Sequence, residues 1–155
     1  MAITRTSTSE PPEAVWAVLA DGWRYAEWVV GCRRIRAVDP GWPAPGTRFH
    51  HELGVGPLRL RDHSESLEVD EGRRLVLRAR AWPAGEGRVT ITITPEGGGG
   101  SLVEMEEHPT AGLAKRLDSP PVDLATHLRN EVALRRLARA AARSGSTGSR
   151  SPGPS

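Results

Sequence analysis

Three polar side chains stand in expected strands at positions where the residues two places away are largely apolar. They are His51, Asp62 and Glu107. Because alternate residues of a strand face the same side of a sheet, we expect all three to project inward with the apolar residues. Burial raises the pKa of a carboxyl group, and a histidine with two such acids could polarise a carbonyl or move a proton next to one. These residue types therefore suit acid–base chemistry on a carbonyl compound.

The same three residues also fit a role without chemistry. Perturbed titratable groups are often structural, and polar groups at a cavity mouth can hydrogen-bond one another or the backbone and only orient a ligand. Two aromatic residues share this ambiguity. Tyr25 and Trp28 could line an entrance and stack on a planar ligand, or they could simply pack a short helix against the sheet.

Other reactive groups in the chain indicate no further site. His50 and His51 are adjacent in a strand and face opposite sides, and His127 has no histidine four residues away, so we expect no metal. Cys32 is the single cysteine, which excludes an intramolecular disulfide, and no neighbouring histidine indicates a nucleophile. The glycine run 97–100 precedes no helix that would form a phosphate site. We therefore expect no metal and no cofactor.

The elements that position these residues follow from hydrophobic periodicity and turn signals. A strand is expected over 2–6 and a short helix or turn over 24–30. Between them, a helix is expected that is capped by Ser9, has prolines in its first turn and ends at Asp21-Gly22. Alternation with a period of two then predicts strands over 33–38, 47–53, 58–69, 73–82, 88–94 and 101–108. A long helix is expected from Pro120 to about Arg143. Its predicted buried stripe consists of Leu124, Leu128, Val132 and Leu137.

Strands joined by short turns favour an antiparallel sheet, and alternation on one side means that one face is covered. Only the C-terminal helix is long enough to cover it. We therefore predict an α+β fold in which a curved antiparallel sheet of about seven strands wraps around that helix, with two short helices at the side. Such an arrangement encloses more volume than its side chains fill, so it implies a cavity.

Composition narrows the class of protein further. The 155 residues suit one domain, expected over 1–143, followed by a disordered tail of Gly, Ser and Pro over 144–155. The 21 Lys and Arg against 19 Asp and Glu give a net charge of only +2, without the basic patch of a nucleic-acid-binding protein. No apolar segment approaches the ~18 residues of a membrane span, and no signal peptide is evident. We expect a cytoplasmic protein, as a monomer or weak homodimer.

Several segments resemble a known superfamily. They are Pro-Glu-Ala-Val-Trp-Ala-Val-Leu-Ala-Asp at 12–21, Trp-Val-Val-Gly-Cys at 28–32, Pro-Gly-Thr-Arg-Phe at 45–49, Arg-Asn-Glu at 129–131 and Leu-Arg-Arg-Leu at 134–137. Together with the order of elements, they resemble the START/Bet-v-like (SRPBCC) superfamily, in particular its bacterial polyketide cyclase/dehydrase-like members, over about residues 3–143. The resemblance implies a helix-grip fold whose cavity takes a lipid, polyketide or other hydrophobic small molecule. Because this superfamily contains carriers, sensors and cyclases, it does not by itself select a reaction.

Our leading hypothesis is a binding protein for a hydrophobic small molecule, without enzymatic activity. The alternative is a cofactor-independent aromatase/cyclase or dehydratase that uses His51, Asp62 and Glu107 as acid and base. A third interpretation, a protein-interaction module, predicts a cavity filled by side chains. The residues expected to contact the ligand are Tyr25, Trp28, Phe49, His51, Leu60, Asp62, Leu77, Ala79, Ile91, Met105, Glu107 and Leu128, with Leu58 as a further part of the wall.

Overall fold

The structure, a computed structural model, describes residues 2–82, 85–112, 115 and 120–147. The chain begins with strand β1 (Ala2–Thr8), helix α1 (Pro12–Leu19), a 3₁₀ turn (Gly22–Arg24) and the short helix α2 (Tyr25–Trp28). Six strands follow: β2 (Cys32–Val38), β3 (Arg48–Val55), β4 (Leu58–Asp70), β5 (Arg74–Ala81), β6 (Gly85–Pro95) and β7 (Ser101–Ala111). Helix α4 (Pro120–Thr147) ends the described chain.

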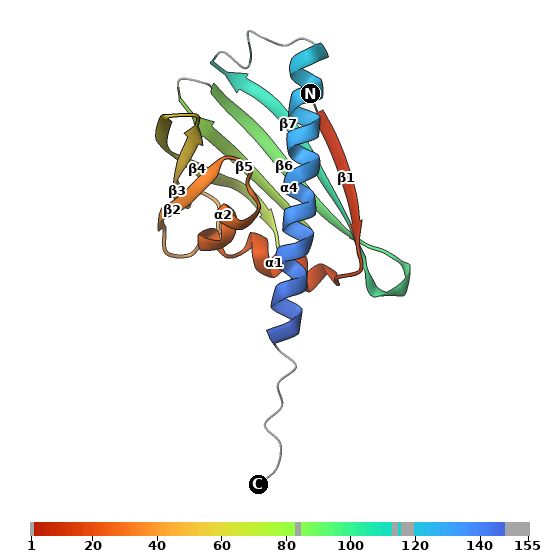
Figure 1. Ribbon diagram of the computed structural model, residues 1–155. Coiled ribbons are helices and arrows are strands. Elements are labelled where there is room, and N and C mark those ends of the chain that lie inside the picture. Colours follow the sequence, from red (N-terminus) through yellow and green to blue (C-terminus); the bar gives the residue numbers. More distant parts are fainter. Residues whose placement is uncertain (1, 83–84, 113–114, 116–119, 148–155) are drawn as a thin grey trace.

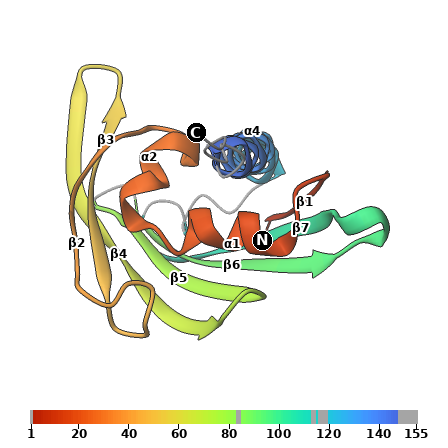
Figure 2. The same cartoon turned by 90° about the horizontal axis from the view of Figure 1, so that it is seen from below.

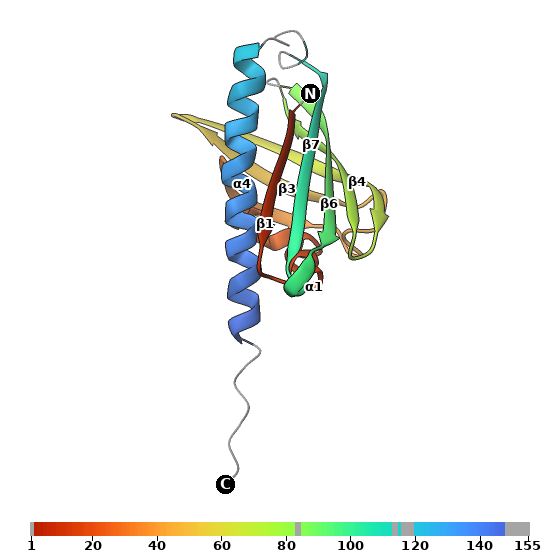
Figure 3. The ribbon, with the colours of Figure 1, turned by 90° about the vertical axis from the view of Figure 1, so that its right-hand side faces the viewer.

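The seven strands form one antiparallel sheet in the order β1-β7-β6-β5-β4-β3-β2. The N-terminal strand therefore pairs with the last one, and the other neighbours follow the chain as hairpins. Figure 2 shows that the sheet curves around the inner side, where α1, α2 and α4 lie. The long helix crosses this concave side and runs beside β1 (Figures 1 and 3). The α+β, helix-grip architecture predicted from the sequence is confirmed.

The core lies where α4 and α1 meet the inner face of the sheet. Fully buried residues of α1, such as Val15 and Leu19, belong to one hydrophobic cluster with Leu134 and Leu137 of α4 and Ile91 of β6. Small residues on the same face of α4 let its backbone approach α1 and the sheet closely. They are Ala133, Ala140 and Ala141, each at most 5% exposed. This packing holds one end of α4 firmly and leaves its N-terminal half over the cavity described below.

The buried stripe predicted for α4 is wrong in its N-terminal half. Leu124, Leu128 and Val132 are exposed, and only Leu137 of the predicted set is buried. A helix advances about 100° per residue, so the observed buried face, which contains Asn130, Leu134 and Leu137, lies opposite Leu128. A repeat of apolar residues every four positions fits the predicted face and the observed face of α4 equally well. The face that contacts the sheet is the one rich in alanine.

The C-terminal boundary also differs from the prediction. Helix α4 continues to Thr147 instead of ending near Arg143. The guanidinium group of Arg24 donates to the hydroxyl oxygen of Ser144 and, over 3.0 Å, to the carbonyl oxygen of Ala140. Ser144 is therefore part of the packed helix rather than of a disordered tail. The rest of the expected tail, from residue 148 onward, lies outside the described residues. Even α4, the longest helix described, lacks the apolar length that a bilayer span requires.

Candidate functional site

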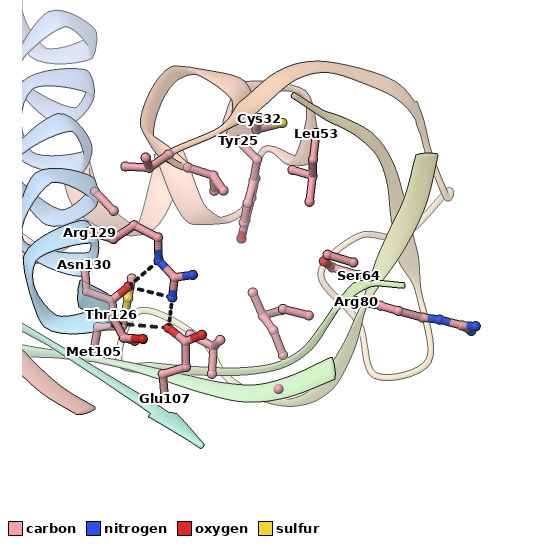
Figure 4. A pocket seen from close by; sticks show the side chains of 18 of the residues that line it. Tyr25, Cys32, Leu53, Ser64, Arg80, Met105, Glu107, Thr126, Arg129 and Asn130 are labelled. Carbon is pink, nitrogen blue, oxygen red and sulfur yellow. Dashed lines mark hydrogen bonds and ion pairs between the residues drawn. The ribbon is translucent and has the colours of Figure 1, made fainter. Parts of the chain in front are cut away.

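A cavity of about 290 Å³ lies between α2, α4 and the inner face of the sheet. Figure 4 shows side chains from these elements around the same space, although the guanidinium group of Arg80 points away from it. Its lining is apolar for the most part, and the aromatic, small and polar residues occupy separate parts of the wall. The lining residues discussed below are Tyr25, Trp28, Cys32, Phe49, His51, Leu53, Ser64, Leu77, Ala79, Arg80, Ala81, Gly85, Gly87, Met105, Glu107, Thr126, Arg129, Asn130 and Ala133.

One wall is an aromatic cluster on α2 and β3. The ring of Tyr25 lies 4.4 Å from that of Phe49 and 4.9 Å from that of Trp28, measured between centroids. The Tyr25 hydroxyl donates to the carbonyl oxygen of Leu19 over 2.8 Å, and Trp42 donates to the same oxygen from its indole nitrogen. Burial, together with the charge of Asp21, raises the pKa of Tyr25 well above its ordinary value. The wall is thus fixed in place and uncharged.

Another part of the wall is formed by residues with little or no side chain. They are Ala79 and Ala81 near the end of β5 and Gly85 and Gly87 at the start of β6. A Cβ atom at Gly87 would lie 3.3 Å from the carbonyl oxygen of His108 on the neighbouring strand, which favours glycine there. Larger side chains at these four positions would occupy the cavity. The space therefore follows directly from the sequence of the β5–β6 hairpin.

A polar cluster joins α4 to β7 at the edge of the cavity. One terminal guanidinium nitrogen of Arg129, Nη2, donates to Oε2 of Glu107, and the side-chain amide of Asn130 donates to the same oxygen over 3.0 Å. The Asn130 carbonyl oxygen accepts from Nη2 of Arg129 over 3.2 Å (Figure 4). Asn130 is only 3% exposed. We refer to Glu107, Arg129 and Asn130 as the α4–β7 polar cluster.

A second polar group lies on strands β3 and β4. Nε2 of His51 is 3.3 Å from the hydroxyl oxygen of Ser64. Burial lowers the pKa of His51 to about 4, against an opposing effect from Asp62, so its imidazole is neutral near pH 7. Nδ1 of the same ring is buried without a hydrogen-bond partner among the described residues. A neutral, buried imidazole on the cavity wall can accept a proton or a hydrogen bond from a bound molecule.

The comparisons with known proteins agree with this architecture. A family model described as polyketide cyclase/dehydrase and lipid transport matches residues 3–142. The chain belongs to this polyketide cyclase/dehydrase and lipid transport family. The resemblance inferred from sequence segments is thereby confirmed. No curated protein matches the chain in a sequence search.

Solved structures share the fold of this family member at low sequence identity. Protein CV1439 from Chromobacterium violaceum is 21% identical with a TM-score of 0.66, covering 90% of this chain and 96% of its own. Protein NE0264 from Nitrosomonas europaea is 16% identical with a TM-score of 0.71, covering 93% and 95%. The Bet v 1-like protein Ara h 8.0201 is 12% identical with a TM-score of 0.65, covering 91% and 96%. At these identities the likeness shows the fold alone.

Within this fold, the three candidate acid–base residues do not form one group. His51 and Glu107 line the cavity, but Asp62 does not. The Asp62 carboxylate accepts from the backbone nitrogen of Trp82 over 2.9 Å and lies 3.5 Å from Nε of Arg80, so it ties β4 to the end of β5. No hydrogen bond or ion pair joins His51 to Glu107 among the residues that the structure describes. Asp62 pairs in register with His51 and so shares its face of the sheet, as expected, but its carboxylate does not line the cavity.

The apolar residues predicted to contact the ligand also divide into those that line the cavity and those that do not. Those in the lining are Tyr25, Trp28, Phe49, Leu77, Ala79 and Met105. Ile91 is fully buried in the core, and Leu60 does not reach the cavity. Leu58, next to the β3–β4 turn, and Leu128, on the outer face of α4, are 62% and 54% exposed. Alternation identifies the face of a strand correctly, but it does not show how far along that strand the cavity extends.

Several lining residues were not predicted to be there. Arg129 and Asn130 of the polar cluster, Ser64 beside His51, and Leu53 on β3 all line the cavity. Asn130 carried a usable signal, because it stands three and four residues before apolar positions of the helix face that is buried. Leu53 stands two residues after His51 in β3, so strand alternation alone places it on the same face.

The cysteine and the histidines provide no evidence for metal chemistry. Burial raises the pKa of Cys32 to about 11, which keeps its thiol protonated near neutral pH. Within the described part of the chain, no three or more His, Cys, Asp and Glu side chains gather as a metal ion would need. The chemistry that this site can perform rests on the α4–β7 polar cluster and on the His51–Ser64 pair.

Proposed function

We propose that the protein binds a hydrophobic, planar small molecule of about two fused rings in this cavity. The observation that carries the proposal is the aromatic cluster of Tyr25, Trp28 and Phe49, which faces a largely apolar cavity that the short side chains of the β5–β6 hairpin leave open. Aromatic rings attract flat ligands through offset or edge-to-face contacts and remove a large apolar area from water. The membership of the family supports a hydrophobic ligand.

The size of the cavity favours an aromatic metabolite over a long-chain lipid. Its volume of about 290 Å³ is roughly twice the ~150 Å³ of an apolar protein cavity that accepts benzene. It also lies at the lower end of the ~300–1,000 Å³ typical of small-molecule sites. A ligand of naphthalene size that buries ~200 Å² of apolar surface gains about 5 kcal/mol, before the costs of association. We therefore expect weak binding of a bare hydrocarbon.

A second candidate function is catalysis by an aromatase/cyclase or dehydratase. Its support is the neutral imidazole of His51, which is a free base near pH 7 because burial lowers its pKa to about 4. Glu107, on another part of the wall, would be the second acid–base group. Asp62 has no place in this mechanism, because it does not line the cavity and its carboxylate is engaged with the backbone of Trp82 and with Arg80.

Binding is tested with naphthalene and a variant that fills the cavity. Ala79→Phe places a ring in the space beside β5, whereas Ala125→Phe adds the same ring on the exposed side of α4. In calorimetric titrations, we expect the wild type and Ala125→Phe to bind naphthalene and Ala79→Phe to lose binding at least tenfold. Equal binding by all three proteins, or no binding by the wild type, would reject the proposal.

Native mass spectrometry separates the two functions. Molecules that co-purify with the wild type and with His51→Gln are compared after expression in the same cells. A carrier retains the same molecule in both proteins. A dehydrating cyclase that depends on His51 retains, in the variant, a precursor heavier by one water molecule.

A further inference from the structure

In the α4–β7 polar cluster, one nitrogen atom that can donate and one oxygen atom that can accept have no hydrogen-bond partner among the described residues. All the hydrogen bonds between Arg129 and Glu107 use Nη2 of the arginine and Oε2 of the glutamate, and Asn130 also donates to Oε2. Nη1 of Arg129 and Oε1 of Glu107 make no hydrogen bond with any residue that the structure describes. In Figure 4, the other terminal nitrogen of Arg129 and the second oxygen of Glu107 both turn toward the open space.

The charges of Arg129 and Glu107 decide which ligands Nη1 and Oε1 can bind. The positive charge of Arg129 and the negative charge of Glu107 cancel formally, and they are in direct contact. An anionic ligand that approaches Nη1 also approaches the glutamate carboxylate, and a cation at Oε1 approaches the guanidinium group. A neutral oxygen function avoids both repulsions. A carbonyl oxygen can accept from Nη1, and a hydroxyl group can donate to Oε1 while its own oxygen accepts.

The surroundings make this polar contact selective. Met105 and Ala133 lie beside the cluster in the lining, and both are buried. The rest of the lining consists of the aromatic wall, the short residues of the β5–β6 hairpin, the His51–Ser64 pair, further apolar and polar residues, and the charged residues Arg80, Glu86 and Asp123. A hydrogen bond to a charged group is stronger than one between neutral groups, but the side chains of Arg129 and Glu107 are 45% and 20% exposed, and water competes there. We therefore expect a gain of about tenfold in affinity.

We propose that the natural ligand is a neutral, oxygenated aromatic compound, of the keto or phenol class, whose oxygen function binds Nη1 of Arg129 and Oε1 of Glu107. This inference rests on the proposed binding function and adds the chemical class of the ligand. It excludes both pure hydrocarbons and carboxylic acids as preferred ligands, because the first leave the pair unused and the second bring a charge beside Glu107.

The test compares three probes of equal ring size on the wild-type protein at pH 7.5: naphthalene, 2-naphthol and 2-naphthoate. We expect 2-naphthol to bind about tenfold more tightly than naphthalene and more tightly than 2-naphthoate. If naphthalene binds and 2-naphthol binds no better, or if 2-naphthoate binds best, the inference is overturned while the binding function stands. If naphthalene does not bind at all, the proposed function itself fails.

Three variants assign the preference to the cluster. Arg129→Met is expected to remove the advantage of 2-naphthol over naphthalene. Glu107→Gln leaves the arginine charge unbalanced, so 2-naphthoate should gain at least tenfold relative to naphthalene. Arg135→Met, on the exposed side of the same helix, is the matched control and should keep the wild-type ratios. A 2-naphthol advantage that persists in Arg129→Met would overturn the inference, and the wild-type probe series decides the case even if a variant does not fold.

Discussion

Nε2 of His51 lies 3.3 Å from the hydroxyl oxygen of Ser64 on the adjacent strand, while Nδ1 of the same ring is buried and makes no hydrogen bond among the described residues. Only one of the two ring nitrogens is therefore stabilised by a partner. Protonation would require both nitrogens to carry hydrogen, and it would place a charge in an apolar wall. The fold accommodates the neutral ring and resists the charged one.

This relationship predicts how stability depends on pH. The pKa of His51 is lowered to about 4 in the folded protein, whereas an unfolded histidine has a pKa near 6.5. Between these values the unfolded chain binds a proton that the folded chain does not, so the free energy of unfolding decreases as the pH falls from about 6.5 toward 4. At 1.36 kcal/mol per pKa unit, the loss amounts to at most roughly 3 kcal/mol. Urea denaturation at pH 7.5, 5.5 and 4.5 measures it.

Carboxylates also titrate between about pH 6.5 and 4. The prediction is therefore tested by comparing variants with the wild type. His51→Gln keeps a nitrogen near Ser64 but cannot titrate, and we expect it to lose clearly less stability on acidification than the wild type. His108→Gln is the control, since this histidine lies beside Glu106 with a side chain that is 43% exposed, and it should behave as the wild type does. Identical pH profiles for His51→Gln and the wild type would show that His51 is not the source of the stability lost at acidic pH.

The sheet could be predicted because its signals are local. Phe49, His51 and Leu53 alternate with outward residues, and all three line the cavity as their strand face requires. The position of Asp62 could not be predicted in this way. Its carboxylate is engaged by the end of β5, and that contact depends on the register of two strands rather than on alternation within one.

The α4–β7 polar cluster could not be predicted from strand alternation either, but the reason is different. Glu107 was identified from its strand, but its partners Arg129 and Asn130 are more than twenty residues away on a helix. A helix-face analysis could have found Asn130 only if the correct face of α4 had been known. The leucines at 124 and 128 are more hydrophobic than the alanines that form the true contact, so hydrophobicity alone selected the wrong face.

The observed orientation of α4 predicts unequal effects for two leucines that are six residues apart. Leu134 is fully buried, and Leu134→Ala should lower the free energy of unfolding by about 2–5 kcal/mol because it leaves a cavity in the core. Leu128→Ala removes the same atoms from an exposed position and should change it by less than about 1 kcal/mol. Urea denaturation of both variants provides the measurement. Comparable losses for the two would contradict the orientation of the helix.

The carbonyl oxygen of Leu19 predicts coupling between two aromatic residues. It accepts from the Tyr25 hydroxyl over 2.8 Å and from the Trp42 indole nitrogen over 3.2 Å. Tyr25→Phe alone leaves the bond from Trp42, so we expect a cost of about 1 kcal/mol. Trp42→Phe costs more because it also removes packing area. The double variant should lose about 1–2 kcal/mol beyond the sum, since a carbonyl that accepted two bonds is then left with neither.

A double-mutant cycle from chemical denaturation measures this excess, because Tyr25→Phe keeps the ring that contacts Trp42 and removes only the hydroxyl group. The matched control combines Tyr25→Phe with Trp23→Phe. Trp23 is 58% exposed, and its side chain makes no hydrogen bond to Leu19 in the described structure, so the two effects should add within about 0.5 kcal/mol. Strict additivity for Tyr25 and Trp42 would mean that water replaces the lost donors, and that the aromatic wall is held by ring packing alone.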